Sequence, residues 1–164
     1  DAGLDSSRGY RSLMHGVEPQ VIVTETLDQE ARAIADWLGS GDLSRCCLAA
    51  RTNKLVERYA HALEGAGIET LRILPDTADD PRRPGLRVAT MHRVKGLEFD
   101  RVVIAGMTDK AMPLAAAVAR SSDDAVRREA ETMERALLYV AMTRARAAVL
   151  VTAHGKPSRW LKRS

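Results

Sequence analysis

The feature that most constrains the fold of this chain is the alternation of short apolar runs with longer segments of helical periodicity. The runs are rich in Val, Ile, Leu and Ala, as in strands buried on both faces. Between them, apolar residues recur three and four positions apart, which is typical of amphipathic helices. Strands are predicted at residues 20–24, 45–50, 68–74, 86–89, 101–105 and 148–152, and helices at 27–38, 54–64 and 123–143, with a short helical turn at 158–161. This order predicts an α/β fold with a mostly parallel sheet and helices on both faces.

Local signals mark the ends and the faces of the predicted helices. Thr26, followed three residues later by Gln29, is the signature of a capping box. Thr52 or Asn53 can cap the next helix, and Gly39 ends the first. The long helix at 123–143 is predicted to turn one apolar face inward, made of Val126, Ala130, Met133, Leu137 and Val140.

Length and composition indicate one domain. The chain has 164 residues, 45% of them apolar, which suffices for a sizeable core. We assign residues 20–164 to this domain and residues 1–19, rich in Gly, Ser, Asp and Arg, to a linker or lead-in. The net charge is +3. This mildly basic balance is compatible with a nucleic-acid partner and does not require one. The excess of arginine over lysine suits phosphate recognition and fits a GC-rich genome equally well.

The two cysteines and the apolar runs indicate the cellular setting. Cys46 and Cys47 are adjacent in a predicted strand, so their side chains point to opposite faces and a framework disulfide is not expected. Reduced core thiols favour a cytoplasmic location. No apolar run approaches the length of a membrane span, and Asp1 does not begin a signal peptide, so no membrane partner is expected. The missing initiator Met predicts a fragment of a longer protein.

The sequence contains no complete nucleotide site. It has no G-x-x-x-x-G-K-[ST] loop; the stretch 155–158 (GKPS) lacks the preceding glycine, and Pro157 removes a backbone donor. No acidic pair follows an apolar strand as in a magnesium-holding element, and no metal-ligand spacing is present. Any nucleotide chemistry would therefore need groups from elsewhere.

Two stretches carry residues that core packing alone does not explain. Residues 87–100 (RVATMHRVKGLEFD) place a Thr, a His, a Lys-Gly pair and a Glu in one connection between apolar runs. Residues 134–146 (ERALLYVAMTRAR) place arginines at the end of an amphipathic segment. In this order they resemble motifs V and VI of UvrD/Rep-type superfamily 1 DNA helicases. Residues 48–53 (LAARTN) resemble motif IVa of the same family.

The resemblance covers roughly residues 17–163 and implies the second, C-terminal RecA-like lobe of such a helicase, called 2A. This is a P-loop NTPase-like fold that lacks the P-loop itself, which lies on the N-terminal lobe. Two departures from the family are evident. Motif IV is not intact and is only echoed by residues 9–12 (GYRS), and the short loop at 75–85 leaves no room for a sizeable 2B insertion.

The resemblance implies that four residues meet the nucleotide. Arg144 matches the arginine that reaches the ATP γ-phosphate, and Glu98 matches the acceptor for the ribose; Lys95 and Gly96 would line the cleft. Each has a structural alternative. Arg144 could be a surface arginine near a helix C-terminus, Glu98 could form an ion pair, and Lys95 could pack under its loop. Arg146 is ambiguous and could be structural. ATP and Mg²⁺ would be held mainly by the N-terminal lobe of the same protein, which is the implied partner.

The resemblance also implies five contacts to single-stranded DNA. They are Arg51, Thr52 and Asn53 after one strand, and Thr90 and His92 after another. The carboxyl ends of parallel strands gather at one sheet edge, where ligands bind. The alternatives are helix capping by Thr52 or Asn53 and a purely structural His92.

The expected function is therefore the C-terminal part of an ATP-dependent 3′–5′ DNA helicase or translocase, inactive as an isolated chain. The sequence also allows two other functions. One is a stand-alone module that binds single-stranded DNA. The other is an interaction module that no longer takes part in ATP hydrolysis, and the presence of Glu98 and Arg144 argues against it.

Overall fold

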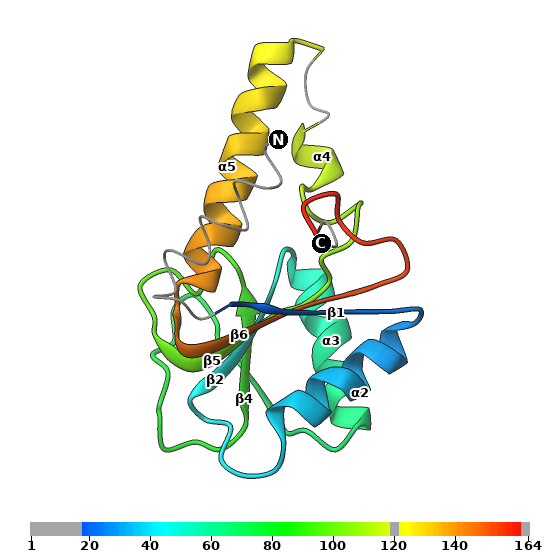
Figure 1. Ribbon diagram of the computed structural model, residues 1–164. Helices are drawn as coiled ribbons and strands as arrows, with labels where there is room; N and C mark the ends of the chain where they lie inside the picture. The colour runs from blue at the N-terminus through cyan, green and yellow to red at the C-terminus, as the bar shows by residue number, and fades with distance from the viewer. Residues whose placement is uncertain (1–17, 119–121, 162–164) are drawn as a thin grey trace.

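The computed structural model describes residues 18–118 and 122–161. In this part of the chain six strands form one parallel sheet with the order β1-β6-β5-β2-β4-β3. Figure 1 labels all of them except β3, which lies at the edge beside β4. Because every neighbouring pair is parallel, the carboxyl ends of all six strands lie at one edge, here called the carboxyl edge, and their starts lie at the amino edge. The strands are β1 (Gln20–Thr24), β2 (Cys46–Ala50), β3 (Thr70–Arg72), β4 (Leu86–Thr90), β5 (Phe99–Ile104) and β6 (Ala145–His154).

Within residues 18–118 and 122–161, four helices connect or flank the strands: α2 (Leu27–Leu38), α3 (Asn53–Gly65), α4 (Ala115–Val118) and α5 (Asp124–Met142). The predicted capping box is present. The Thr26 hydroxyl accepts from the Gln29 backbone at 3.2 Å, and the Gln29 side chain accepts from the Thr26 backbone. Thr52 caps α3 in the same manner, accepting from the Leu55 backbone at 3.2 Å. These polar side chains satisfy helix N–H groups that have no partner inside the helix.

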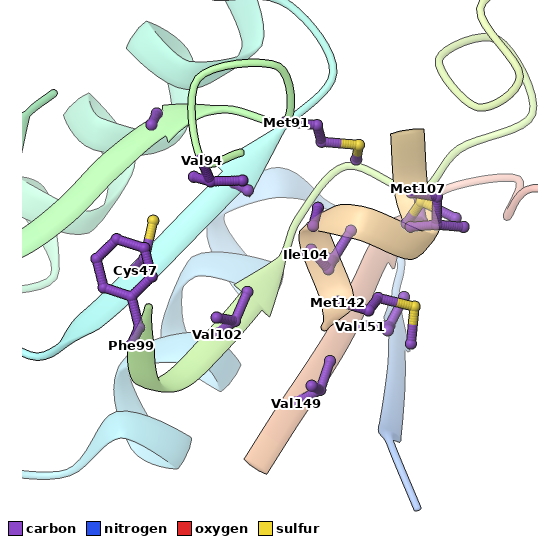
Figure 2. Packing of buried hydrophobic residues seen from close by; sticks show 14 of the residues in the cluster. Cys47, Met91, Val94, Phe99, Val102, Ile104, Met107, Met142, Val149 and Val151 are labelled. Carbon is purple, nitrogen blue, oxygen red and sulfur yellow. The ribbon is translucent and has the colours of Figure 1, made fainter. Parts of the chain in front are cut away.

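Two apolar cores lie on the opposite faces of the sheet. On one face, α2 and α3 pack against alternate strand residues such as Cys46 and Leu48. On the other face, the last turns of α5 and the segments around Met91 and Met107 cover the intervening residues, Cys47 among them (Figure 2). Both cysteines are free and buried, one in each core, as predicted. The α/β class and the helices on both faces are confirmed.

The predicted inward face of the long helix is wrong. Met133 and Val126 are 67% and 46% exposed. The first half of α5 extends beyond the sheet beside α4 (Figure 1), so it has little to pack against. Only its last turns reach the sheet, and there the buried positions are Glu134, Leu138, Ala141 and Met142. The buried face is thus shifted by one residue along the sequence: Glu134, Leu138 and Ala141 are buried where Met133, Leu137 and Val140 were predicted.

The loop at residues 75–85 is held by one buried side chain. Arg87 on β4 is completely buried. Its guanidinium donates to the Asp79 carboxylate at 3.1 Å and to the backbone carbonyls of Asp80, Arg83 and Gly85 at 2.7 to 2.8 Å. A buried charge needs such partners, and this cluster supplies them. The loop, predicted to replace a 2B insertion, is therefore tied down by polar contacts rather than by an apolar core.

Most predicted boundaries agree with the structure within a few residues. The predicted strand at 68–74 is shorter, as β3, and β6 is longer than predicted at both ends. The segment around Pro113 is irregular as predicted, and the short helix α4 follows it. The last described residues form a turn in which the Leu161 backbone donates to the Ser158 carbonyl at 2.9 Å. In the described residues no helix combines the length and the apolar character needed to cross a membrane.

Candidate functional site

The candidate residues separate onto the two edges of the sheet. Arg51 follows β2 and Thr90 ends β4, so both lie at the carboxyl edge. Glu98 precedes β5 and Arg144 precedes β6, so both lie at the amino edge. α5 runs against the strand direction, from beyond the carboxyl edge back to the amino edge (Figure 1). One helix therefore passes both groups of residues.

At the amino edge the structure brings Glu98, Arg144 and Arg146 together. Arg146 Nη2 donates to the Glu98 carboxylate at 2.5 Å, and both side chains are more than half exposed. The hydrogen bond from Arg146, its charge and the nearby charge of Arg144 hold the pKa of Glu98 below its ordinary value. The same bond raises the pKa of Arg146. Glu98 thus takes the ion pair that the sequence left open as an alternative, and Arg146 is its partner.

Arg144 is held at the junction of α5 and β6. Its Nε donates to the Val140 carbonyl at 3.1 Å and its Nη2 to the Thr143 hydroxyl at 3.2 Å. Its own carbonyl accepts from the Phe99 backbone at 2.9 Å, which joins this junction to the start of β5. A guanidinium at the C-terminal end of a helix is favoured by the helix dipole, so the position is also stable without a ligand.

Lys95 and Gly96 are exposed in the turn that leads to Glu98. Gly96 has a φ of 83°, where residues with a side chain are strained. A Cβ at this position would meet no atom within 4 Å, so glycine is required here by the backbone conformation and not by a close approach within the domain. Lys95 makes no ion pair with any residue that the structure describes.

At the carboxyl edge the segments after β2 and β4 are neighbours. Ala50 pairs with Thr90, and the Met91 backbone donates to the Ala50 carbonyl at 2.9 Å. His92 is exposed, and its pKa is lowered by partial burial and then by the charge of Arg51. Arg51 and His92 therefore lie at the same edge, as predicted.

Three of the residues predicted to contact DNA also form side-chain hydrogen bonds within the domain. Thr52 caps α3, Asn53 accepts from Arg72 Nη2 at 2.7 Å, and the Thr90 hydroxyl accepts from the Arg93 backbone at 3.2 Å. The capping alternative is thus correct for Thr52. Such bonds fix the orientation of a side chain and leave its remaining hydrogen-bonding capacity for a ligand.

Glu134 is a member of this region whose role the sequence did not settle. Arg51 Nε and Nη2 each donate to its carboxylate at 2.9 Å, and the Leu114 backbone donates to it at 2.7 Å. The signal was present in the sequence. Glu134 shares helical spacing with Leu138 and Ala141, which places it on the buried face. In the described residues no group of three or more His, Cys, Asp or Glu side chains is arranged to hold a metal ion.

A six-stranded parallel sheet covered on both faces, in a sequence without a phosphate loop, defines a RecA-like lobe that lacks the phosphate-binding element. A model of the UvrD-like helicase C-terminal domain family matches residues 75–156. The chain belongs to this family.

Individual relatives agree with that assignment. The chain is 36% identical over 94 residues to the ATP-dependent DNA helicase UvrD2 of Mycobacterium tuberculosis strain H37Rv, which is 57% of this chain and 13% of that protein. It is 34% identical over 110 residues to the putative ATP-dependent DNA helicase YjcD of Bacillus subtilis strain 168, covering 66% of this chain and 13% of the relative. The chain thus matches only a small part of the length of these relatives.

Solved structures share the fold. The C-terminal domain of a possible DNA helicase from Lactobacillus plantarum WCFS1 superposes with a TM-score of 0.62 at 21% identity, covering 96% of this chain and 89% of that one. The Arterivirus nonstructural protein 10 helicase, in complex with DNA, gives a TM-score of 0.50 at 14% identity and covers 91% of this chain and 30% of its own. At these identities the likeness concerns the fold alone.

Proposed function

We propose that this chain is the second RecA-like lobe of a longer ATP-dependent DNA helicase or translocase. It completes the ATP site of an N-terminal lobe with its amino edge and contacts single-stranded DNA with its carboxyl edge. The observation that carries this proposal is the separation of the motif residues into two groups at opposite edges. Their family relatives are named as ATP-dependent DNA helicases, which supports the same reading.

The amino edge has the chemistry that a nucleotide requires. The Glu98 carboxylate accepts hydrogen bonds from ribose hydroxyls, and the Arg144 guanidinium stabilises negative charge on phosphoryl oxygens through its planar set of donors. Glu98 is exposed and Arg144 is partly exposed, so a second lobe can approach both side chains. Lys95 and Gly96 would face the same cleft. The phosphate loop and the ligands for Mg²⁺ would come from the N-terminal lobe.

The carboxyl edge has the chemistry that single-stranded DNA requires. Arg51 supplies positive charge for a phosphate, while Thr52, Asn53 and Thr90 supply small polar groups for the backbone. His92 offers an exposed ring on which a base can stack. Because the two edges are distinct, hydrolysis at one and movement of DNA at the other do not compete for the same residues. A change in the relative position of the two lobes would couple ATP hydrolysis at one edge to DNA movement at the other.

ATP hydrolysis with and without single-stranded DNA tests the proposal. We expect no turnover above background from the 164-residue chain alone, and DNA-stimulated turnover from the longer protein that also carries the N-terminal lobe. Turnover by the chain alone that is abolished by Arg144→Ala would contradict the proposal. A longer protein that binds single-stranded DNA but never hydrolyses ATP would instead indicate a helicase-derived binding module.

A further inference from the structure

Glu134 is a buried carboxylate that bonds to two segments outside its own helix. Its carboxylate accepts hydrogen bonds from Nε and Nη2 of Arg51, directly after β2, and from the Leu114 backbone just before α4. The exposed fractions of the Arg51 and Glu134 side chains are 13% and 6%. A buried carboxylate needs donors on both oxygens, and here the charge of Arg51 also neutralises it. The contact is therefore a fixed part of the domain and not a mobile surface pair.

The contact occupies only one side of the Arg51 guanidinium. Nε and Nη2 bind Glu134, whereas Nη1 makes no hydrogen bond within the described residues. The guanidinium is planar and rigid, so fixing one side also fixes the direction of the other. His92 lies close enough for the Arg51 charge to lower its pKa. One side of the partly exposed Arg51 guanidinium thus has no protein partner among the described residues, at the edge that carries the other candidate DNA contacts.

α5 connects this contact to the opposite edge. Glu134 lies in the middle of the helix, and about 12 Å of helix separates it from Met142, after which Thr143 and Arg144 follow. A helix of this length behaves as a stiff element. A force on Arg51 from bound DNA is therefore applied directly to the helix that ends beside Arg144.

We propose that Glu134 is a positioning residue that holds Arg51 in place for single-stranded DNA and fixes Arg51 to α5, the helix that leads to Arg144. This inference rests on the proposed function. It assigns to Glu134 no contact with substrate; the residue acts through Arg51. The opposite arrangement, in which Glu134 competes with DNA phosphate for Arg51, predicts tighter DNA binding when the carboxylate is removed and is an outcome of the test.

A double-mutant cycle on single-stranded DNA binding measures the link. In the longer protein, Arg51→Ala is expected to weaken binding about tenfold, since a charged hydrogen bond is lost. Glu134→Gln keeps the size of the side chain but not its charge, and it is expected to weaken binding about threefold. Because both changes act on one contact, the double variant is expected to bind within about twofold of Arg51→Ala alone.

The second measurement is the stimulation of ATP hydrolysis by DNA. Glu134→Gln is expected to reduce the stimulation at saturating DNA at least threefold, with the KM for ATP unchanged within about twofold, because the nucleotide site is not touched. Glu131→Gln is the matched control. Glu131 lies on the same helix but pairs with Arg135 and Arg159, and its variant should behave as the parent in both assays.

The outcomes separate this inference from the proposed function. A parent protein without DNA-stimulated hydrolysis overturns both. A stimulated parent whose Glu134→Gln variant is equally stimulated, or binds DNA more tightly, overturns the inference alone, as does a double variant in which the two losses multiply. If Glu134→Gln does not fold, Glu134→Asp keeps the charge with a shorter reach, and the same cycle with it must again be non-additive.

Discussion

The two edges of the sheet use the same kind of ion pair in opposite ways. At the amino edge, Glu98 and Arg146 form a pair that is more than half exposed. At the carboxyl edge, Arg51 and Glu134 form a pair that is almost completely buried and has a third contact from Leu114. Exposed pairs contribute little to stability because water and salt compete for both partners. Buried pairs leave a costly unpaired charge when one partner is removed.

The difference indicates which edge can exchange partners. A carboxylate in an exposed pair can pass from an arginine to a ribose hydroxyl at small cost. In the proposed function, Glu98 would therefore alternate between Arg146 and the nucleotide. A guanidinium fixed by a buried carboxylate keeps its direction whether or not DNA is present. Under the proposed function, the exposed pair at the amino edge would suit a nucleotide that binds and leaves in each cycle, and the buried pair at the carboxyl edge would suit a DNA strand held in register.

The largest effect is expected at the amino edge. In the longer protein, Arg144→Ala should reduce ATP hydrolysis by about 10³–10⁵-fold while most ATP and DNA binding remains, because such an arginine acts mainly in the transition state. Arg144→Lys should restore little, since a point charge does not replace a planar fork. Steady-state hydrolysis with a parallel nucleotide-binding assay measures both. Arg45→Ala, at an exposed pair of the same edge, is the control; near-normal turnover by Arg144→Ala would refute the role.

The next largest effect concerns stability at the carboxyl edge. Glu134→Ala should lower the free energy of unfolding of the 164-residue chain by about 3 kcal/mol, because Arg51 is left almost buried and without a partner. Urea denaturation followed by circular dichroism gives the value. Glu131→Ala on the same helix should cost less than about 1 kcal/mol, since its pairs lie nearer the surface. Equal losses in the two variants would remove the contrast between buried and exposed pairs.

A smaller effect is expected in the salt dependence of DNA binding. Arg51→Ala should make the slope of log affinity against log salt concentration shallower by about 0.7, the contribution of one phosphate of a single strand. ATP hydrolysis without DNA should change little, whereas its stimulation by DNA should fall. Fluorescence titrations at several salt concentrations give the slope. An unaltered slope would mean that Arg51 meets no phosphate and serves only the pair with Glu134.

The smallest effect concerns the titration of Glu98. Its pKa lies below 4.5 chiefly because Arg146 donates a hydrogen bond to it, so Arg146→Ala should raise this pKa toward that value. A carboxyl group whose pKa is lower in the folded than in the unfolded state stabilises the fold at pH values above its unfolded-state pKa. This stabilisation is lost as the pH falls through the folded-state pKa. Carboxyl-carbon NMR titration of the chain measures the shift. A midpoint that does not move would show that the pair does not form in solution.

Much of the fold could be predicted because its signals are local. Residues 20–24 and 27–38 were predicted with their observed bounds, since a β-branched run and a capping box each depend on a few neighbouring residues. The inward face of α5 could not be predicted in the same way. Its apolar residues show helical periodicity, but the sheet ends before the helix does, and nothing local in the sequence reports where the sheet ends.

The candidate site was predicted unevenly for a similar reason. The positions of Arg51 and His92 at one edge follow from strand direction alone and agree with the structure. The two partners, Glu134 for Arg51 and Arg146 for Glu98, come from segments distant in sequence, and pairing between such segments is set by the tertiary fold. The chemical roles at both edges remain predictions.

The buried guanidinium of Arg87 has a consequence for how this family member can change in evolution. It holds the loop at residues 75–85 through one carboxylate and three backbone carbonyls. Because backbone carbonyls are present whatever the side chain, these contacts do not depend on the identity of most loop residues. Most of the loop should therefore drift freely in close homologues, whereas Arg87 and Asp79 should be replaced together, by an uncharged pair. Covariation of Arg87 and Asp79 would then be the main sequence sign of the contacts that hold this loop.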